Sequence, residues 1–223
     1  RTRNRPLVTG EMTPRAALVF ALSLEAAAFA LLWATVNLLS AVLAVSACAF
    51  YVFVYTLWLK RTSKQNIVIG GAAGAVPTLI GWTAVTGRLD WAPVVLFAVI
   101  FFWTPPHFWA LALFVETDYA AAGVPMMPVV AGLLSTRRQI LIYAVLLLPL
   151  TLLPFWLKLA GWLYGVSALV LSGLFLLLAL RVAVFRGGAT DMDMRPEKRL
   201  FGYSVLYLFV LFAALVADRF LIG

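Results

Sequence analysis

Long apolar stretches separated by short polar segments dominate the hydrophobic pattern of this chain. A helix needs about 20 residues to cross about 30 Å of hydrocarbon, and windows of that length fit seven times. These windows are apolar on all sides, whereas the strands of a transmembrane β-barrel alternate between apolar and polar residues. The pattern therefore predicts seven transmembrane helices, at residues 16–35, 39–59, 67–86, 91–114, 140–157, 162–181 and 201–217.

The connections between these windows are short, except for residues 115–139 and 182–200. Short connections join helices that lie side by side and run antiparallel. The expected fold class is therefore all-α, a polytopic transmembrane helix bundle that forms a single domain over residues 1–223. Residue 1 is Arg and no cleavable leader precedes the first window, so we expect the chain to lack an N-terminal part.

Composition supports the membrane class. The chain is 64% hydrophobic and only 12% charged, which is too little polar surface for a soluble globule of 223 residues. Its net charge is +8, but no basic run is long enough to follow nucleic-acid phosphates, so nucleic acid is a poor candidate partner. The single cysteine, Cys48, lies in an apolar run, and we expect a small core or lipid-facing residue there rather than redox chemistry.

The distribution of positive charge predicts the orientation of the bundle. If the first 15 residues are cytoplasmic, 14 of the 17 Lys and Arg residues fall on that side. The other side receives only Arg88, Lys158 and Arg219. A charged substrate is therefore expected to approach from the cytoplasm.

Basic and acidic residues meet on this predicted cytoplasmic side. The segment RTRNRPL brings Arg1 and Arg5, and LKRTSKQN brings Lys60, Arg61 and Lys64. Such groups either grip phosphate oxygens or serve only as positive anchors for topology. Glu116 and Asp118 have no basic neighbour between residues 103 and 135, a spacing that is equally compatible with Mg²⁺ held together with substrate phosphates and with a solvated acidic loop.

The segment WTPPHFWALALF at residues 103–114 holds the only histidine, His107, next to a pair of prolines. Because neither proline has a backbone N–H group, the pair is expected to kink or break the helix and to direct His107 toward the bundle or its mouth. The imidazole can ligate iron, act as a base or bond to a freed carbonyl. Trp103, Phe108 and Trp109 can shield a carbocation with their π faces or simply pack.

Three other features are interpreted as architectural. The glycines from Gly70 to Gly81 give the third window a smooth face for close helix packing. Glu25 lies in the middle of the first window, where a hydrogen bond between helices is favoured over a substrate contact. The segment DMDMRPEKR, at residues 191–199, mixes acids and bases and is favoured as a self-paired loop over a second metal site.

Several motifs together resemble the protoheme IX farnesyltransferase (haem O synthase) family of UbiA-type intramembrane prenyltransferases. The segments that carry the resemblance are RTRNRPLVTG, YTLWLKRTSKQNIVIGGAAGAVPTLIGW, WTPPHFWALALF, DYAAAGVPMMPVV and LFGYSVLYL. The resemblance implies about nine helices around a central cavity, two of them upstream of residue 1 with a first acidic motif. Arg1, Thr2, Arg5, Pro6 and Leu7 match the tail that follows that motif.

The resemblance also implies an activity and roles for residues. Asp118, followed by Tyr119, corresponds to the second acidic motif and would position Mg²⁺ and diphosphate, while the basic residues named above would grip phosphate oxygens. Farnesyl diphosphate would ionise, a haem B vinyl group would attack the allylic cation, and water would complete haem O. His107 would lie near the haem, with Tyr119, Trp103 and Trp109 around the cavity. A bacterial inner-membrane location, and haem A synthase or cytochrome oxidase assembly partners, are expected on the same basis.

Other functions compete with this interpretation. A prenyltransferase acting on a quinone or tetrapyrrole precursor commonly carries Asp-x-x-x-Asp, whereas Ala122 stands four residues after Asp118. A small-molecule permease usually shows internal repeats with matched broken spans, which this sequence lacks. A haem-handling assembly factor without catalysis would need His107 but not the phosphate-gripping residues.

Overall fold

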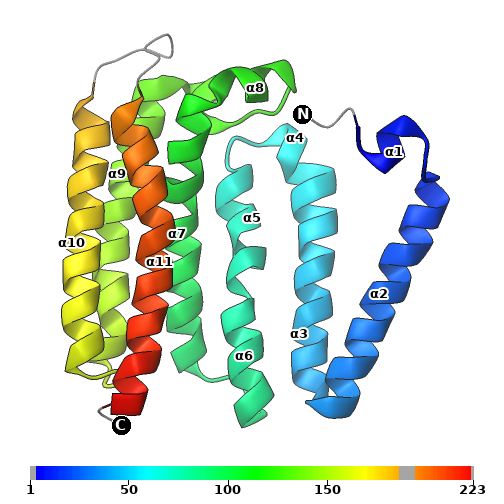
Figure 1. Ribbon diagram of the computed structural model, residues 1–223, viewed down its shortest axis with the longest axis horizontal. Coiled ribbons are helices and arrows are strands. Elements are labelled where there is room, and N and C mark those ends of the chain that lie inside the picture. The colour runs from blue at the N-terminus through cyan, green and yellow to red at the C-terminus, as the bar shows by residue number, and fades with distance from the viewer. Residues whose placement is uncertain (1–3, 186–193, 222–223) are drawn as a thin grey trace.

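The computed structural model describes residues 4–185 and 194–221, and its elements in these ranges are all helical. Seven helical segments within these ranges are long and apolar enough to cross a membrane. Figure 1 shows the long helices side by side, with their connections at the two ends of the bundle. The predicted all-α transmembrane bundle is confirmed.

Two short helices lie outside the spans, namely α1 (Pro6–Thr9) and α8 (Glu116–Ala121). Several helix starts follow local rules, because α2, α6 and α9 carry proline in their first turn, where no backbone donor is needed. Thr13 caps α2 by accepting a hydrogen bond from Ala16 N at 3.2 Å. In chain order the spans are α2 (Pro14–Thr35); α3 (Leu38–Ala49) continued by η1 (Phe50–Leu59) and α4 (Lys60–Thr62); α5 (Asn66–Ala75) with α6 (Pro77–Thr86); α7 (Trp91–Phe114); α9 (Met127–Trp156); α10 (Trp162–Val184); and α11 (Arg195–Leu221).

The segment 115–139 is not a long loop, and that expectation is wrong. It contains α8, and α9 begins at Met127 instead of residue 140. Pro128 suits the first turn of α9, and Gly132 interrupts the helix with φ 78° before it continues. A search for uniformly apolar windows misses this part because Arg137, Arg138 and Gln139 stand within the helix.

The proline pair in α7 does not break the helix. Pro105 and Pro106 are both buried inside α7, which runs on to Phe114. Proline removes backbone donors but still fits helical φ, and close packing on both sides holds the segment helical. Of the two expected outcomes, a kink or a break, the structure therefore excludes the break.

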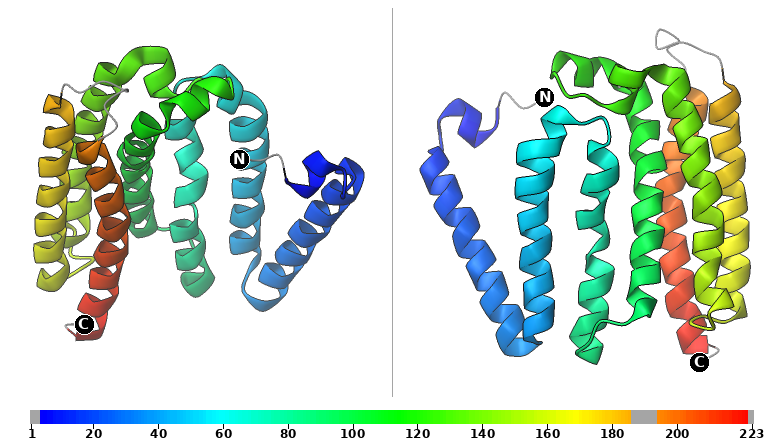
Figure 2. Two further views of the ribbon diagram at one scale, coloured as in Figure 1. Left: turned by 45° about the horizontal axis from the view of Figure 1, so that its top comes forward. Right: turned by 180° about the vertical axis from the view of Figure 1, so that it is seen from behind.

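The core of the bundle lies among α7, α9, α10 and α11, which pack against one another and bury most of the large apolar side chains. A buried polar cluster joins three of these helices: the Tyr207 hydroxyl lies 2.8 Å from Thr151 Oγ1 and 3.1 Å from Ser172 Oγ. In contrast, α2 has no buried residue and packs mainly against α3. Figure 2 shows α2 and α3 at the side of the bundle away from α10.

Candidate functional site

The charged residues singled out in the sequence gather at one end of the bundle, here called the α8 end. Lys60 and Arg61 lie in α4, and Lys64 follows it; all three are exposed. Arg5 precedes α1, and Figure 1 places α1, α4 and α8 at this same end. Arg1 lies outside the described residues. The structure thus brings three separate segments of sequence to one rim, residues 5–9, 60–64 and 116–121.

The helix α8 lies across this end and covers the start of α5. Its Tyr119 packs against a small cluster formed by Ile67, Ala112 and Met126, and it lies near Tyr55 of η1. Glu116 and Asp118 stand in its first turn, half-buried and exposed respectively. The first turn of a helix favours carboxylates, because its free N–H groups carry partial positive charge.

These two carboxylates fit a metal that is shared with a substrate. In the residues that the structure describes, no cluster of three or more His, Cys, Asp or Glu side chains can hold a metal ion. Mg²⁺ does not need such a cage, since one or two carboxylates plus phosphate oxygens commonly hold it. The donor set of Glu116 and Asp118 therefore suits Mg²⁺ bound with diphosphate, and does not suit a structural metal.

Asn66 is a further residue of this rim that the sequence analysis did not select. Its side chain is 1% exposed, and neither Oδ1 nor Nδ2 has a hydrogen-bond partner. A buried amide without partners costs free energy, so it normally meets water or a ligand. Its position two residues after Lys64, in KRTSKQN, was the signal that could have identified it.

An apolar cavity of about 400 Å³ lies among η1, α5, α7 and α11. Ile67 lines it and also belongs to the cluster under Tyr119, which connects the charged rim with the cavity. Tyr51 and Tyr55 of the π-helix line one side, with ring centroids 5.1 Å apart. The complete lining consists of Tyr51, Tyr55, Ile67, Gly70, Gly71, Gly74, Ile100, Trp103, Thr104, Phe108 and Leu208.

The glycines of α5 serve both packing and the cavity. A Cβ on Gly71 would lie 2.8 Å from Thr104 Cγ2, and one on Gly70 would collide with the Tyr55 ring. The close approach of α5 to α7 and η1 therefore requires these two glycines. Gly74 differs, because a Cβ there would meet open space in the cavity wall.

His107 lies on the other side of Trp103. Its ring stacks on Trp103 at 4.3 Å and on Phe201 at 4.9 Å, and its Nδ1 lies 2.6 Å from Ser204 Oγ. Trp103 also donates from Nε1 to Ser204 O at 2.9 Å, which ties α7 to α11. A second cavity of about 540 Å³ lies here, lined by Ile100, Trp103, His107, Val205, Leu208, Phe209 and Phe212. Trp103, Ile100 and Leu208 are shared by both cavities.

The two other aromatic residues of this segment, Phe108 and Trp109, lie in different surroundings. Phe108 lines the first cavity, whereas Trp109 is fully buried in the core against Tyr143 and lines neither cavity. Residues 108 and 109 point in different directions because successive helical positions are turned by about 100°. Of the three aromatic residues predicted around the cavity, Trp103 lines it, Tyr119 packs against Ile67 but does not line it, and Trp109 lies in the core.

Two architectural expectations have clear outcomes. The side chain of Glu25 in α2 lies close to Cys48 in α3, in line with the favoured contact between helices. Glu197, in contrast to the expected surface loop, is fully buried and forms an ion pair with Arg137 of α9 at 2.7 Å. Asp191 and Asp193 lie outside the described residues.

Comparison with known proteins identifies the family. The model of the UbiA prenyltransferase family matches residues 1–204. This chain belongs to the UbiA prenyltransferase family. It is 54% identical over 221 residues to a protoheme IX farnesyltransferase from Erythrobacter litoralis (strain HTCC2594), with 99% of this chain and 72% of that protein aligned. It is 56% identical over 219 residues to the protein of the same name from Novosphingobium aromaticivorans, with 98% and 72% aligned.

A third relative, from Rhizorhabdus wittichii, bears the same name and is 52% identical over 221 residues, which cover 99% of this chain and 73% of that protein. No solved structure matches the chain. Membership in this family makes the chain a prenyltransferase, so the charged rim and the apolar cavity connected with it are its candidate active site.

Proposed function

We propose that this chain transfers the farnesyl group of farnesyl diphosphate to a vinyl group of protoheme IX (haem B) and so makes haem O. The observation that carries the proposal is a rim of carboxylates and cations that is connected through Ile67 to an apolar cavity. A prenyl diphosphate needs a polar site for its diphosphate and an adjoining apolar cavity for its isoprenoid tail. The relatives named protoheme IX farnesyltransferase support the choice of both substrates.

Charge stabilisation is the main task of the rim. When the bond between the prenyl C1 and the diphosphate oxygen breaks, the electron pair moves onto the leaving group. Lys60, Arg61 and Lys64, with Arg1 and Arg5, supply positive charge to the phosphate oxygens. Asp118 and Glu116 would hold Mg²⁺, which when bound neutralises further negative charge. The amide of Asn66 can donate to an oxygen that reaches the buried side of the rim.

The cavity protects the cation that remains. Tyr51, Tyr55 and Trp103 surround it with π faces, which attract positive charge, and the apolar walls exclude water. The terminal vinyl carbon of haem B then forms a bond to C1 of the farnesyl cation. Water adds to the other vinyl carbon and loses a proton, which gives the hydroxyethylfarnesyl group.

A product assay tests the proposal. Membranes containing the protein would receive farnesyl diphosphate, haem B and Mg²⁺, and the extracted haems would be separated by chromatography and mass spectrometry. We expect a more hydrophobic haem, heavier by one farnesyl group and one hydroxyl group. If no such haem forms and a prenylated quinone precursor forms instead, the assignment of the acceptor is wrong.

His107 is proposed to face haem iron through Nε2. Ser204 Oγ donates to Phe201 O at 2.6 Å, so its remaining role toward His107 Nδ1 is that of acceptor. Nδ1 then carries the proton and Nε2 keeps a lone pair for iron, an arrangement often set by such a second hydrogen bond. We expect His107→Ala to shift the Soret band of haem-loaded protein, and Ser204→Ala to shift it less. A spectrum that is identical in wild type and His107→Ala would exclude ligation.

Gly74→Leu is expected to lower farnesyl transfer about tenfold or more, because the side chain would occupy the cavity and even one methylene of misfit in an apolar pocket costs about 10- to 200-fold. With geranyl diphosphate, which is one isoprene unit shorter, the same variant should lose less of its transfer rate. Gly81→Leu is the matched control, since Gly81 also meets open space in the same span but does not line the cavity. Equal losses in the two variants would exclude Gly74 as part of the tail site.

The location of the protein follows from the same assignment. We place it in a bacterial inner membrane with the α8 end in the cytoplasm, because positive residues concentrate there. Arg88, Lys158 and Arg219 then face the other side. Haem A synthase and cytochrome oxidase assembly factors are the expected downstream partners, since they would use haem O.

A further inference from the structure

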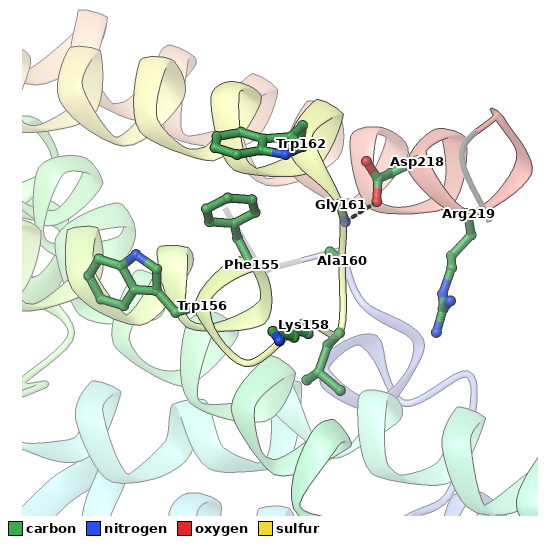
Figure 3. Close-up of a pocket in the computed structure, with 9 residues that line it drawn as sticks. Phe155, Trp156, Lys158, Ala160, Gly161, Trp162, Asp218 and Arg219 are labelled. Carbon is green, nitrogen blue, oxygen red and sulfur yellow. Dashed lines mark hydrogen bonds between the residues drawn. The ribbon is translucent and has the colours of Figure 1, made fainter.

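The end of the bundle opposite α8 carries a cavity that the proposed reaction does not use. It has a volume of about 550 Å³, within the range of about 300–1,000 Å³ typical of small-molecule sites. The connection between α9 and α10 forms most of it, and the end of α11 completes it. Figure 3 shows its lining residues, among them Phe155, Trp156, Lys158, Trp162, Asp218 and Arg219.

Two cations line this cavity. Lys158 comes from the α9–α10 connection and Arg219 from α11, and no ion pair joins either of them to a carboxylate in the described ranges. The one acid of the lining, Asp218, is 3% exposed and turned toward the backbone, where it accepts hydrogen bonds from Gly161 N and from Tyr164 N, the latter at 3.1 Å. Asp218 thus caps the start of α10, which leaves the cavity with an excess of positive charge.

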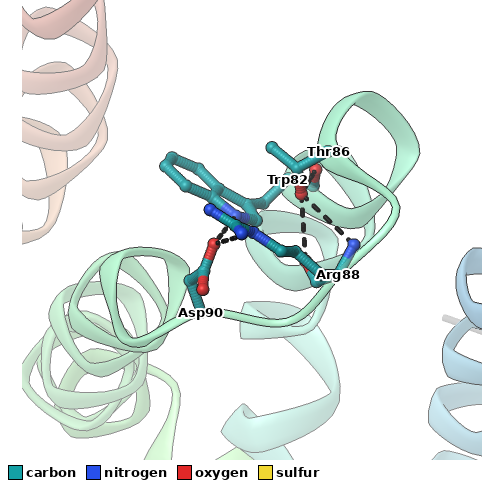
Figure 4. A network of polar contacts seen from close by, with 4 residues as sticks. All are labelled: Trp82, Thr86, Arg88 and Asp90. Atoms are coloured by element: carbon teal, nitrogen blue, oxygen red, sulfur yellow. Dashed lines mark hydrogen bonds and ion pairs between the residues drawn. The ribbon is translucent and has the colours of Figure 1, made fainter.

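Arg88, the third basic residue predicted for this end of the bundle, differs from Lys158 and Arg219 because it is paired with a carboxylate. Arg88 Nε lies 3.0 Å from Asp90 Oδ2, and Trp82 Nε1 donates to the same oxygen at 3.4 Å (Figure 4). The charge of Arg88 is therefore balanced within its own turn.

Lys158 stands in an unusual backbone conformation, with φ 58°, the one positive φ of a non-glycine residue in the ranges that the structure describes.

The remaining lining is aromatic and apolar. Trp156 and Trp162 are 57% and 72% exposed, as expected for side chains at the boundary between lipid and water. Phe155 and Leu159 provide apolar surface beside the cations. We propose that this cavity binds the phosphate head group of an anionic phospholipid, with Lys158 and Arg219 on the phosphate and the acyl chains along the apolar wall. The charge complementarity favours an anionic lipid over a zwitterionic one.

Native mass spectrometry of the detergent-solubilised protein tests this proposal. The probes are phosphatidylglycerol and phosphatidylcholine with identical acyl chains, each titrated separately, and inorganic phosphate as a third arm. An anionic lipid gains roughly fivefold in affinity from each nearby Lys or Arg. We expect wild type to prefer phosphatidylglycerol, and the Lys158→Gln/Arg219→Gln variant to bind it about 25-fold more weakly, with phosphatidylcholine unchanged.

Arg88→Gln is the matched control, because it removes one positive charge from the same end of the bundle but outside the cavity. It should bind phosphatidylglycerol as wild type does. If the double variant proves unstable, the single variant Lys158→Gln serves as the test, and we expect it to bind phosphatidylglycerol about fivefold more weakly than wild type. Equal binding of the two lipids by wild type, an undiminished preference in the variants, or displacement of phosphatidylglycerol by equimolar inorganic phosphate would each overturn the proposal.

Discussion

Asp118→Asn is expected to lower farnesyl transfer at least about 100-fold, the size of loss seen when one electrostatic contact to developing charge is removed. The substitution keeps the shape of the side chain and removes its negative charge. Asp118 stands in the first turn of α8 and is exposed, at the end of the bundle that also carries Lys60, Arg61 and Lys64. Without the carboxylate the rim would hold Mg²⁺ poorly, so we also expect a higher Mg²⁺ concentration for half-maximal rate.

The matched control for this substitution is Asp90→Asn. Asp90 lies at the opposite end of the bundle, where it pairs with Arg88. Its replacement removes the same charge but should leave the rate and the Mg²⁺ response close to those of wild type. Initial rates of haem O formation, measured over a series of Mg²⁺ concentrations, compare the two variants. A wild-type rate and Mg²⁺ response in Asp118→Asn would show that this carboxylate does not take part.

The sequence predicted the number and most of the bounds of the spans because hydrocarbon thickness fixes how many apolar residues a helix needs. The window at 91–114 coincides with α7. The early start of α9 at Met127 was missed, since Arg137 within that helix excludes it from an apolar window. The burial of Arg137 depends on its pairing with Glu197, 60 residues later, and a pair that is so far apart in the sequence leaves no local signal.

The site could be predicted in part. Charged residues such as Lys60 and Asp118 stand out in an apolar chain, and short connections between antiparallel spans bring alternate loops to one end. Which aromatic residues reach a cavity depends on the rotation of each helix, so Trp103 and Trp109 could not be told apart. The roles that we assign to individual residues stay predictions.

The buried ion pair between Arg137 and Glu197 is expected to dominate the stability of the α8 end. Arg137 is 1% exposed; its Nε and Nη2 reach Glu197 Oε1 at 2.9 and 2.7 Å, and its Nη1 donates to Phe185 O at 2.8 Å. The guanidinium also lies 4.9 Å from the centre of the Phe185 ring. One side chain thus connects α9, the end of α10 and the start of α11.

Arg137→Met is expected to reduce the free energy of unfolding by about 3–5 kcal/mol, because it leaves Glu197 as a buried charge without compensation. Arg137→Met/Glu197→Met should recover most of this loss, since an apolar pair of similar volume avoids the cost of burying two ions. Arg138→Met is the neighbouring control: Arg138 is exposed, so the change should be within about 0.5 kcal/mol. Unfolding in detergent, followed by helical circular dichroism, measures all three. If Arg138→Met destabilises as much as Arg137→Met, or if the double variant is the least stable, then the effect of Arg137 does not come from the uncompensated charge of Glu197.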